Sequence, residues 1–313
     1  MTSEKSVASS SEPFSLSPPD GFSVVEREAA LLLIREGLSE DVPEGDLTTD
    51  ALVPEGVAVR GAFVPRQAGV LCGLPVVAEL FRSIEPAISL RPFRTDGDGV
   101  VAGEPILGIS GPVHPILLGE RLALNFLQRL SGVASATKMI AEAIGDTSCQ
   151  VFDTRKTTPG WRFLEKYAVR VGGGQNHRMH LSESSLVKDN HRQVLSWLGD
   201  DDPVDWVARL RRARSEARVE LEVDTLEEFS KALTAEPDVI LLDNFSIEDL
   251  ICAVQLVKET SHRRPELEAS GGISLRNARA VAETGVDRIA LGAMTHSAPA
   301  LDIGLDLVEL KGA

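Results

Sequence analysis

Hydrophobic and polar segments alternate regularly over the second half of the chain. Six short apolar runs, each ending in polar residues, are typical of buried strands; they are QVFDT, SLVKDN, RVELEVD, DVILLDN, ELEASG and DRIALG. Helical patterns lie between most of them, at Trp161–Val171, Pro203–Arg214, Leu226–Leu233, Ile247–Lys258 and Ser274–Thr284. Because alternating strands and helices indicate a parallel sheet, we expect an α/β barrel that is TIM-like but incomplete.

The first half of the chain has a different pattern. A helix is expected at Val24–Glu36, followed by a polar loop at residues 40–54. Short apolar stretches broken by Gly and Pro then predict a small α+β unit. A long helix is expected from Gly119 to about Ile144, with a buried stripe and a separate polar face. The stripe is Leu122, Phe126 and Leu130, and the polar face is Arg121, Asn125 and Gln128.

Composition and charge restrict the kind of function. The net charge of -15 argues against nucleic acid as a partner. The three cysteines, at positions 72, 149 and 252, have no metal-ligand spacing and are typical of reduced thiols in a cytoplasmic protein. No apolar stretch approaches the ~20 residues that span a bilayer. Met1–Gly21 lacks the apolar run of a signal peptide, so we interpret it as a flexible tail.

Polar residues follow every predicted strand of the barrel. One polar strand end is usually a helix cap, but six successive ones predict a functional cleft, since these ends form the active-site rim of α/β barrels. They are Asp153–Lys156, Lys188–Asn190, Glu222 with Asp224, Asp243–Asn244, Glu268 with Ser270–Gly272, and Gly292.

Positive charge is concentrated between residues 154 and 192, where eight basic and three acidic residues give a net charge of +5. A cationic region in an acidic protein predicts a site for a small ligand with several negative charges. Lys166 and Arg170, one turn apart, are expected on a solvated helix face. The basic residues expected in the site are Arg155, Lys156, Arg178 and Lys188.

Glycines and carboxylates add to this site. Gly172–Gly174 precede Gln175–Arg178, which suggests a loop where backbone and ligand approach closely. Gly-rich ends of the last barrel strands commonly bind phosphate. For Glu222 and Asp243, three interpretations stay open: binding Mg²⁺ with a phosphorylated sugar, stabilising a cationic transition state, or pairing with a lysine of the basic cluster.

The segment DTRKTTPGWRFLEKYAVRVGGGQNHRMHLSESSLVKDNH, residues 153–191, closely resembles the central signature of quinolinate phosphoribosyltransferases. The resemblance extends over about residues 31–307, through EDVPEGDLTTD, GERLALNFLQRLSGVASAT, LLDNF, EASGGIS and GVDRIALGAMTHSAPALDIGLDL. It implies the conversion of quinolinate and phosphoribosyl pyrophosphate (PRPP) to nicotinate mononucleotide, pyrophosphate and carbon dioxide, a step of NAD biosynthesis. The reaction calls for no redox cofactor.

The resemblance also implies domains and residue roles. A sandwich-like α+β domain is expected at residues 22–131, with 303–313 packing back on it, and an open barrel at 132–302. The pyridine dicarboxylate pocket would be lined by Arg155, Arg162, His177, Arg178 and Lys188. PRPP and Mg²⁺ would be held by Lys156, Glu222, Asp243, Ser270, Gly272, Gly292 and His296, with Thr154 and Gly271 adding substrate contacts. The catalytic residues would be Lys156, Glu222 and Asp243.

The resemblance further implies a homodimer with shared active sites, or a higher oligomer built from it, in which Arg121 enters the neighbouring subunit's site. Two alternatives remain. One is a related barrel acting on another aromatic acid, such as nicotinate, or serving molybdate handling. The other is a phosphate-ligand sensor without catalysis. Four or five basic groups fit a dicarboxylate better than nicotinate, and the acidic pair beside Lys156 argues against a sensor.

Overall fold

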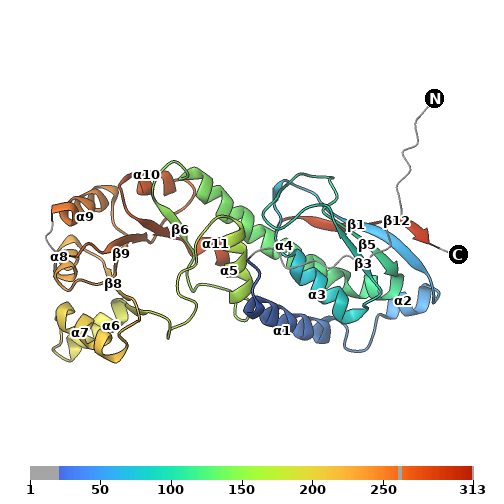
Figure 1. Ribbon diagram of the computed structural model, residues 1–313, viewed down its shortest axis with the longest axis horizontal. Coiled ribbons are helices and arrows are strands. Elements are labelled where there is room, and N and C mark those ends of the chain that lie inside the picture. Colours follow the sequence, from blue (N-terminus) through green and yellow to red (C-terminus); the bar gives the residue numbers. More distant parts are fainter. Residues whose placement is uncertain (1–20, 260–262, 312–313) are drawn as a thin grey trace. The chain divides into compact units, whose positions relative to one another are not determined.

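The computed structural model describes residues 21–259 and 263–311 (Figure 1). Within these, the chain forms two compact units. The first contains residues up to 68, residues 73–128 and those from 302 onward, and the second contains residues 69–72 and 129–301. Except for Gly21, the expected tail lies outside the described residues.

An antiparallel sheet forms the centre of the first unit. Its strand order is β12-β1-β5-β3. The final strand β12 pairs with β1 along its whole length, so the end of the chain completes this sheet (Figure 1). The strands are β1 (Ala58–Pro65), β3 (Ser89–Pro92), β5 (Leu107–Pro112) and β12 (Ile303–Lys311), and the chain also forms the two-residue strands β2 (Gly69–Val70) and β4 (Gly99–Val100).

Two short-range capping patterns start the first helices. In α1 (Val24–Asp41) the Ser23 side chain accepts from the Glu26 backbone, and the Glu26 carboxylate accepts from the Ser23 backbone. In α2 (Leu47–Leu52) the Asp46 side chain accepts from the backbone N–H groups of Thr48 and Thr49. The prediction of a continuous loop at residues 40–54 was therefore wrong, because Asp46 caps a short helix there.

The long helix α4 (Val113–Ala143) begins six residues before the predicted start. Pro115 lies in its first turn, where a missing N–H costs nothing. The predicted apolar stripe is buried, as Leu122, Phe126 and Leu130 show. Arg121 and Asn125 are exposed on the polar face, also as predicted. The remaining helix of the first unit, α3 (Leu74–Ile84), buries most of its apolar side chains.

A six-stranded parallel sheet forms the second unit, in the order β6-β11-β10-β9-β8-β7. Its strands are β6 (Gln150–Phe152), β7 (Ser185–Val187), β8 (Val219–Val223), β9 (Val239–Asp243), β10 (Glu266–Ser270) and β11 (Arg288–Ala290). Strands β7 to β11 follow one another in sequence order, and β6, the first, pairs with β11, the last. A closed barrel would also pair β6 with β7. In this sheet β6 and β7 are the two edge strands, and one isolated bridge joins Phe152 of β6 to Gln175. The predicted open α/β barrel is confirmed.

Helices separate these strands, and Figure 1 shows α8 and α9 outside β8 and β9. The helices are α5 (Arg162–Val171), α6 (Asp189–Trp197), α7 (Pro203–Ala213), α8 (Leu226–Thr234), α9 (Ile247–Glu259), α10 (Ala278–Glu283) and α11 (Ala293–His296). The pattern did not predict α6, which buries none of its side chains and so lacks the apolar period that marks a core helix.

The central strands carry the barrel core. Every residue of β8 is buried, as expected for a parallel strand covered on both faces. Because side chains alternate along a strand, Glu220 and Glu222 share one face of it.

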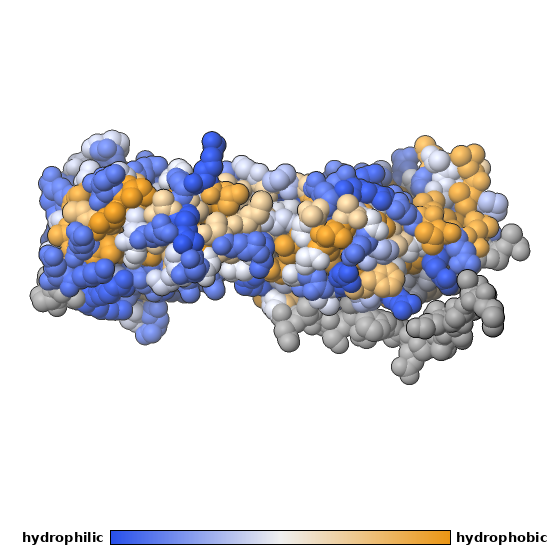
Figure 2. All heavy atoms as spheres, turned by 90° about the horizontal axis from the view of Figure 1, so that it is seen from above, coloured by the Kyte–Doolittle hydropathy of each residue, from blue (hydrophilic) through white to orange (hydrophobic). Residues whose placement is uncertain are grey.

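The face of the molecule in Figure 2 is mostly hydrophilic, with smaller hydrophobic areas. Among the described residues, no helix has both the length and the apolar character needed to cross a membrane.

Candidate active site

The carboxyl ends of neighbouring strands bring predicted residues together. Glu222 on β8 is in register with Leu241 on β9, and Asp243, two residues later, is in register with Ser270 on β10. Three predicted residues therefore lie at one edge of the sheet. This edge is the rim where α/β barrels carry their catalytic groups.

Glu222 makes two contacts at this rim. Its Oε2 accepts from Lys188 Nζ at 2.7 Å, and its Oε1 accepts from the Asp189 backbone N–H at 3.2 Å. The carboxylate is buried, whereas the Lys188 side chain is 46% exposed. Of the three interpretations left open for the acidic pair, pairing with a lysine thus describes Glu222 in this structure.

Asp243 is half-buried beside Glu222. Burial raises its pKa most, and the negative charges of Glu222 and Asp224 raise it further. Lys188 and Lys156 oppose this increase. The carboxyl group therefore lies in a region of excess negative charge, where a bound cation would lower its pKa.

Lys156, Gly292 and His296 meet at a second point. A Cβ atom on Gly292 would lie 2.8 Å from Lys156 Cδ and 3.1 Å from His296 Cδ2. Both side chains therefore need a glycine between them. The Thr295 hydroxyl also donates to the Lys156 carbonyl at 2.8 Å, which joins α11 to the loop after β6.

The loop after β10 is shaped by two glycines with positive φ, Gly271 at 83° and Gly272 at 61°. A Cβ on Gly271 would lie 2.9 Å from the Asn244 backbone nitrogen, so this position is closed to larger residues. By contrast, no heavy atom lies within 4 Å of a Cβ built on Gly272. The backbone at Gly272 is therefore open to a ligand beside Ser270.

Two arginines of the basic cluster, Arg155 and Arg178, have buried donor atoms or side chains. Arg178 is buried, and its Nη1 donates to the Ser184 carbonyl at 2.6 Å. Burial lowers its pKa most, and the positive charge of Arg155 lowers it further. Arg155 Nε is buried without a hydrogen-bond partner. An anion placed here would satisfy a donor and offset two adjacent positive charges.

Other predicted residues of the cluster support the loops. Thr154 Oγ1 accepts from the Lys156 N–H at 3.0 Å. Arg162 donates to Thr157 Oγ1 at 3.1 Å and to the Met179 carbonyl at 3.0 Å. Their polar groups are thus engaged with neighbouring backbone and side chains, which fixes the loop after β6.

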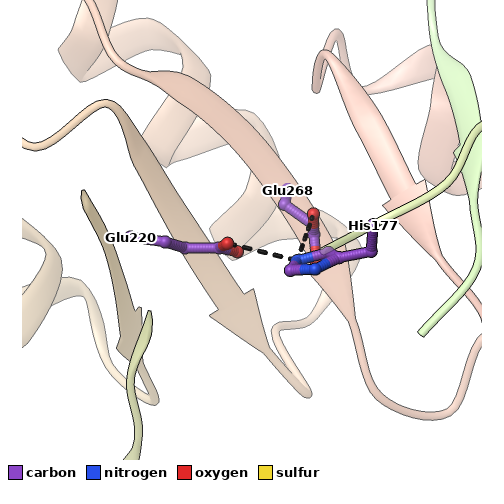
Figure 3. Close-up of side chains that lie close together, drawn as sticks. All are labelled: His177, Glu220 and Glu268. Carbon is purple, nitrogen blue, oxygen red and sulfur yellow. Dashed lines mark ion pairs between the residues drawn. The ribbon is translucent and has the colours of Figure 1, made fainter. Parts of the chain in front are cut away.

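His177 points into a group of buried charges (Figure 3). Its Nε2 lies 3.1 Å from Glu220 Oε2 and 3.8 Å from Glu268 Oε2. Its Nδ1 accepts from the Arg178 backbone N–H at 2.8 Å. The sequence placed Glu268 among the polar strand ends, but the carboxylate lies inside the barrel. Side chains two positions apart on a strand share one face, and Glu220 and Glu268 precede the predicted site residues Glu222 and Ser270 by two positions. This spacing is the sequence signal that could have placed both carboxylates next to the site.

The prediction that Lys166 is solvated was wrong. Its side chain is fully buried, and Nζ donates to Asp153 Oδ1 at 2.5 Å and to the His177 carbonyl at 2.8 Å. Asp153 also accepts from Asn176 Nδ2 and from the His177 N–H. Arg170, half-buried, donates to Asn176. Both residues therefore hold the loop that carries His177, which helical spacing alone did not reveal.

Arg121 is the one predicted site residue of the first unit. It is exposed on α4, and the other predicted residues all belong to the second unit.

A cavity of about 540 Å³ borders Glu222 from among α6, α7 and α8. Its positive charges are already matched, because Arg192 pairs with Asp224 and Glu228, and Lys231 pairs with Glu227. The basic pocket residues Arg155 and Arg178 do not line it. Because these two arginines belong to the predicted basic cluster, we place the candidate site at the strand ends instead.

Comparison with known proteins shows the family to which this chain is similar. The family model for the quinolinate phosphoribosyl transferase N-terminal domain matches residues 46–131, and that for the C-terminal domain matches residues 133–306. Nicotinate-nucleotide pyrophosphorylase (carboxylating) of Mycobacterium leprae is 42% identical over 287 residues, which cover 90% of this chain and 98% of that protein. A probable enzyme of the same name from Synechocystis is 36% identical, covering 88% of this chain and 92% of its own.

Solved structures give the same result. Nicotinate-nucleotide pyrophosphorylase of Francisella tularensis has a TM-score of 0.84 at 35% identity, covering 90% of this chain and 96% of its own. That of Ehrlichia chaffeensis has a TM-score of 0.82 at 34% identity, covering 89% and 98%. Human nicotinic acid phosphoribosyltransferase shares the fold alone, at 14% identity and a TM-score of 0.59. With both family domains matched in order along one chain, this protein belongs to the quinolinate phosphoribosyltransferase family.

Proposed function

We propose that the cleft at the carboxyl ends of β6 to β11 is where this chain joins quinolinate to PRPP. As a member of its family, the chain is a decarboxylating phosphoribosyltransferase whose products are nicotinate mononucleotide, pyrophosphate and carbon dioxide, in NAD biosynthesis. The observation that carries the assignment of the site is the buried Arg155 Nε, a donor left without a partner, in the basic cluster that also contains the buried Arg178.

Quinolinate would bind this basic pocket through its two carboxylates. Guanidinium groups suit such a ligand because they donate in a planar fork. Arg155 and Arg178 would receive the carboxylates, and Lys188, half exposed beside Glu222, would add a further charge. Arg162 and His177 would support this pocket by holding its loops, since their polar atoms are already engaged.

PRPP would occupy the opposite side of the cleft. Lys156 and His296, on either side of Gly292, would receive phosphate oxygens, and the open backbone at Gly272 beside Ser270 would receive others. Gly271 would let the loop after β10 pass close to Asn244, because a side chain at this position would clash with Asn244. Phosphate binding by such loops is common at this end of a barrel.

Charge development in the reaction explains the acidic pair. Pyrophosphate leaves PRPP through a transition state with positive charge on the ribose, which the fixed carboxylates of Glu222 and Asp243 would stabilise. Lys156 would offset the charge on the leaving pyrophosphate. The oxygen donors of Asp243 and Glu222 fit Mg²⁺, which would supply further positive charge at the diphosphate when bound.

Decarboxylation follows from the attack of the quinolinate ring nitrogen on the ribose. The ring then carries a positive charge, which stabilises the carbanion left when the adjacent carboxylate departs as carbon dioxide. A proton taken up from solvent then replaces the carboxylate at that carbon and gives nicotinate mononucleotide. Burial of Arg178 would favour this departure, since a carboxylate held there is solvated less well than in water.

A homodimer completes this proposal, with Arg121 acting in the partner's site. One surface supports such an interface: α6 buries no side chain, and Val194, Trp197 and Leu198 share one of its faces. Trp197 is 77% exposed and Leu198 75%. An apolar face of this kind on a helix is covered in stable proteins. We also assign the enzyme to the cytoplasm, from its pattern of unpaired cysteines.

Subunit exchange tests the shared site. Arg121→Ala and Glu222→Ala are each expected to be nearly inactive alone. If the two are mixed equally and exchange subunits, roughly half the dimers become hybrids, which restores about a quarter of the wild-type sites under two-fold symmetry. Exchange confirmed by mass spectrometry without returning activity would remove Arg121 from the partner's site.

Substrate choice tests the pocket itself. Calorimetry with quinolinate and with nicotinate should show much tighter binding of quinolinate, because only its two carboxylates engage both Arg155 and Arg178. Equal affinity would instead favour the alternative of another aromatic acid as the substrate.

A further inference from the structure

Four charged or polar side chains form a layer inside the barrel, which we call the inner layer: His177, Glu220, Glu268 and Arg288. Arg288 Nε lies 2.6 Å from Glu268 Oε2, and its Nη2 lies 3.6 Å from Glu220 Oε2. All four side chains are at least nine-tenths buried. The Phe152 ring packs against the Arg288 guanidinium at 4.7 Å. Arg288 also reaches Glu266 at 3.4 Å, at the edge of the layer.

The inner layer adjoins the proposed quinolinate pocket. Glu220 precedes Glu222 by two residues on β8, and Glu268 precedes Ser270 by two on β10, so each lies about 7 Å from a residue of the PRPP side of the cleft. The link to the quinolinate pocket is His177, whose Nδ1 accepts a hydrogen bond from the Arg178 backbone N–H. The negative charge of Glu220 also opposes the lowering of the pKa of the Arg178 guanidinium by burial.

Hydrogen bonding fixes the charge of His177. The Arg178 backbone N–H donates to Nδ1, so this nitrogen carries a lone pair and no proton. The only proton of the ring is then on Nε2, facing Glu220 Oε2 at 3.1 Å. His177 is therefore a neutral ring with a fixed tautomer, and any further proton of the inner layer must sit on a carboxylate.

Glu268 is the carboxylate suited to hold that proton. Glu220 receives the His177 N–H, which favours its ionised form, whereas Glu268 lies 3.8 Å from the same nitrogen and beside the charge of Glu220. Burial raises the pKa of Glu268 to about 7, and the charge of Glu220 adds to this effect. The Arg288 guanidinium opposes this increase, the neutral His177 ring faces Glu268 without a net charge, and Leu241 of β9, at the same register, is apolar.

A metal ion is a poorer interpretation of the same group. Ligand atoms of His177, Glu220 and Glu268 lie within 4.8 Å of one another. However, the Arg288 guanidinium already lies against Glu268, and a divalent ion would have to displace it. The positive charge of the inner layer is thus supplied by the chain itself.

We propose that Glu268 is a positioning residue of the quinolinate pocket, which in its protonated form keeps the inner layer electrically neutral and holds His177 beside Arg178. This rests on the proposed function of the pocket. When Glu268 ionises, the inner layer gains one negative charge behind the site of a dianion. At about 7–10 Å and an effective dielectric constant near 20, such a charge weakens binding by roughly tenfold or more.

The pH dependence of kinetics tests this proposal. For the wild type, we expect the KM for quinolinate to rise by about tenfold or more between pH 6 and pH 9 as Glu268 ionises. Glu268→Gln cannot ionise, so its KM should stay near the low-pH value, with little change in kcat. The matched control is Glu266→Gln on the same strand, which touches Arg288 only from the layer's edge and should follow the wild type. A wild-type pH profile in the Glu268→Gln enzyme would overturn the proposal.

The ring of His177 gives a readout that needs no turnover. In ¹⁵N-histidine-labelled, ligand-free enzyme, the signals of His177 can be assigned by comparison with His177→Gln, since the chain has six histidines. We expect a neutral ring protonated on Nε2 from pH 5.5 to 8. An imidazolium signal in that range would contradict the proposal even if the Glu268 variant fails to fold. Failure of quinolinate turnover in the wild type would instead reject the proposed function, and leave this measurement to decide the role of Glu268.

Discussion

Replacing Lys166 by methionine should destabilise the barrel strongly, because it leaves the buried Asp153 carboxylate without its cation. Burial already raises the pKa of Asp153 and lowers that of Lys166, since each charge has been removed from water. The Nζ donates to Asp153 at 2.5 Å and to the His177 carbonyl at 2.8 Å, and both bonds disappear. Breaking one partner of a buried ion pair costs about 3–5 kcal/mol in the free energy of unfolding.

The assay is urea denaturation followed by fluorescence and circular dichroism, with the quinolinate KM measured beside it. Asp153→Asn in the same chain should recover part of the loss, because it removes the stranded charge. The quinolinate KM should be raised in Lys166→Met and stay raised in the double variant Lys166→Met/Asp153→Asn, since the loop that carries His177 and Arg178 has lost its anchor. Lys138→Met is the control: this exposed lysine pairs with Glu142 at 3.5 Å, and its loss should cost no more than about 1 kcal/mol. A loss below about 1 kcal/mol for Lys166→Met would refute the reasoning.

Three further predictions follow from the site. Lys156→Ala and Glu222→Ala should each lower kcat by ~10²–10³ without unfolding the protein, and near wild-type turnover in both would remove them from the mechanism. Arg178→Ala should weaken quinolinate binding by about 1.5–3 kcal/mol and PRPP binding less, as calorimetry can measure, and Arg178→Lys should also be impaired because an ammonium lacks the fork. Because the pKa of Glu268 is raised from 4.5 to about 7, the stability it contributes is complete below pH 4.5 and is lost as the pH rises to 7. The difference in free energy of unfolding between Glu268→Gln and the wild type should therefore grow by about 3 kcal/mol in favour of the variant as the pH rises from 4.5 to 7.5. Parallel curves of unfolding free energy against pH would contradict this.

Much of the fold could be predicted because its signals are local. Apolar runs ending in polar residues located all six barrel strands, and the stripe at Leu122, Phe126 and Leu130 was buried as expected. Helix α2 was missed because the cap at Asp46 lies in a polar, Gly-containing segment that also fits a loop. Helix α6 was missed because nothing on it is buried.

Side-chain environments were harder to predict, because they depend on partners distant in sequence. The i, i+4 spacing of Lys166 and Arg170 is the same for a solvated face and for a buried network, and only the position of Asp153 decides between them. Likewise, Glu268 belongs to a strand end by sequence, but its side chain lies in the barrel interior against the Arg288 guanidinium. The pairing of Glu222 with Lys188 was one of three open interpretations, and sequence alone could not choose among them.

The central claim, that the basic pocket and acidic pair convert quinolinate and PRPP with loss of carbon dioxide, is tested most directly by product stoichiometry. Quinolinate labelled in the carboxylate next to the ring nitrogen is incubated with the enzyme, PRPP and Mg²⁺, and the labelled gas, pyrophosphate and nicotinate mononucleotide are counted. We predict equal amounts of all three, and no comparable turnover of nicotinate. Turnover of nicotinate with equal efficiency, or no product from quinolinate, would contradict the assignment.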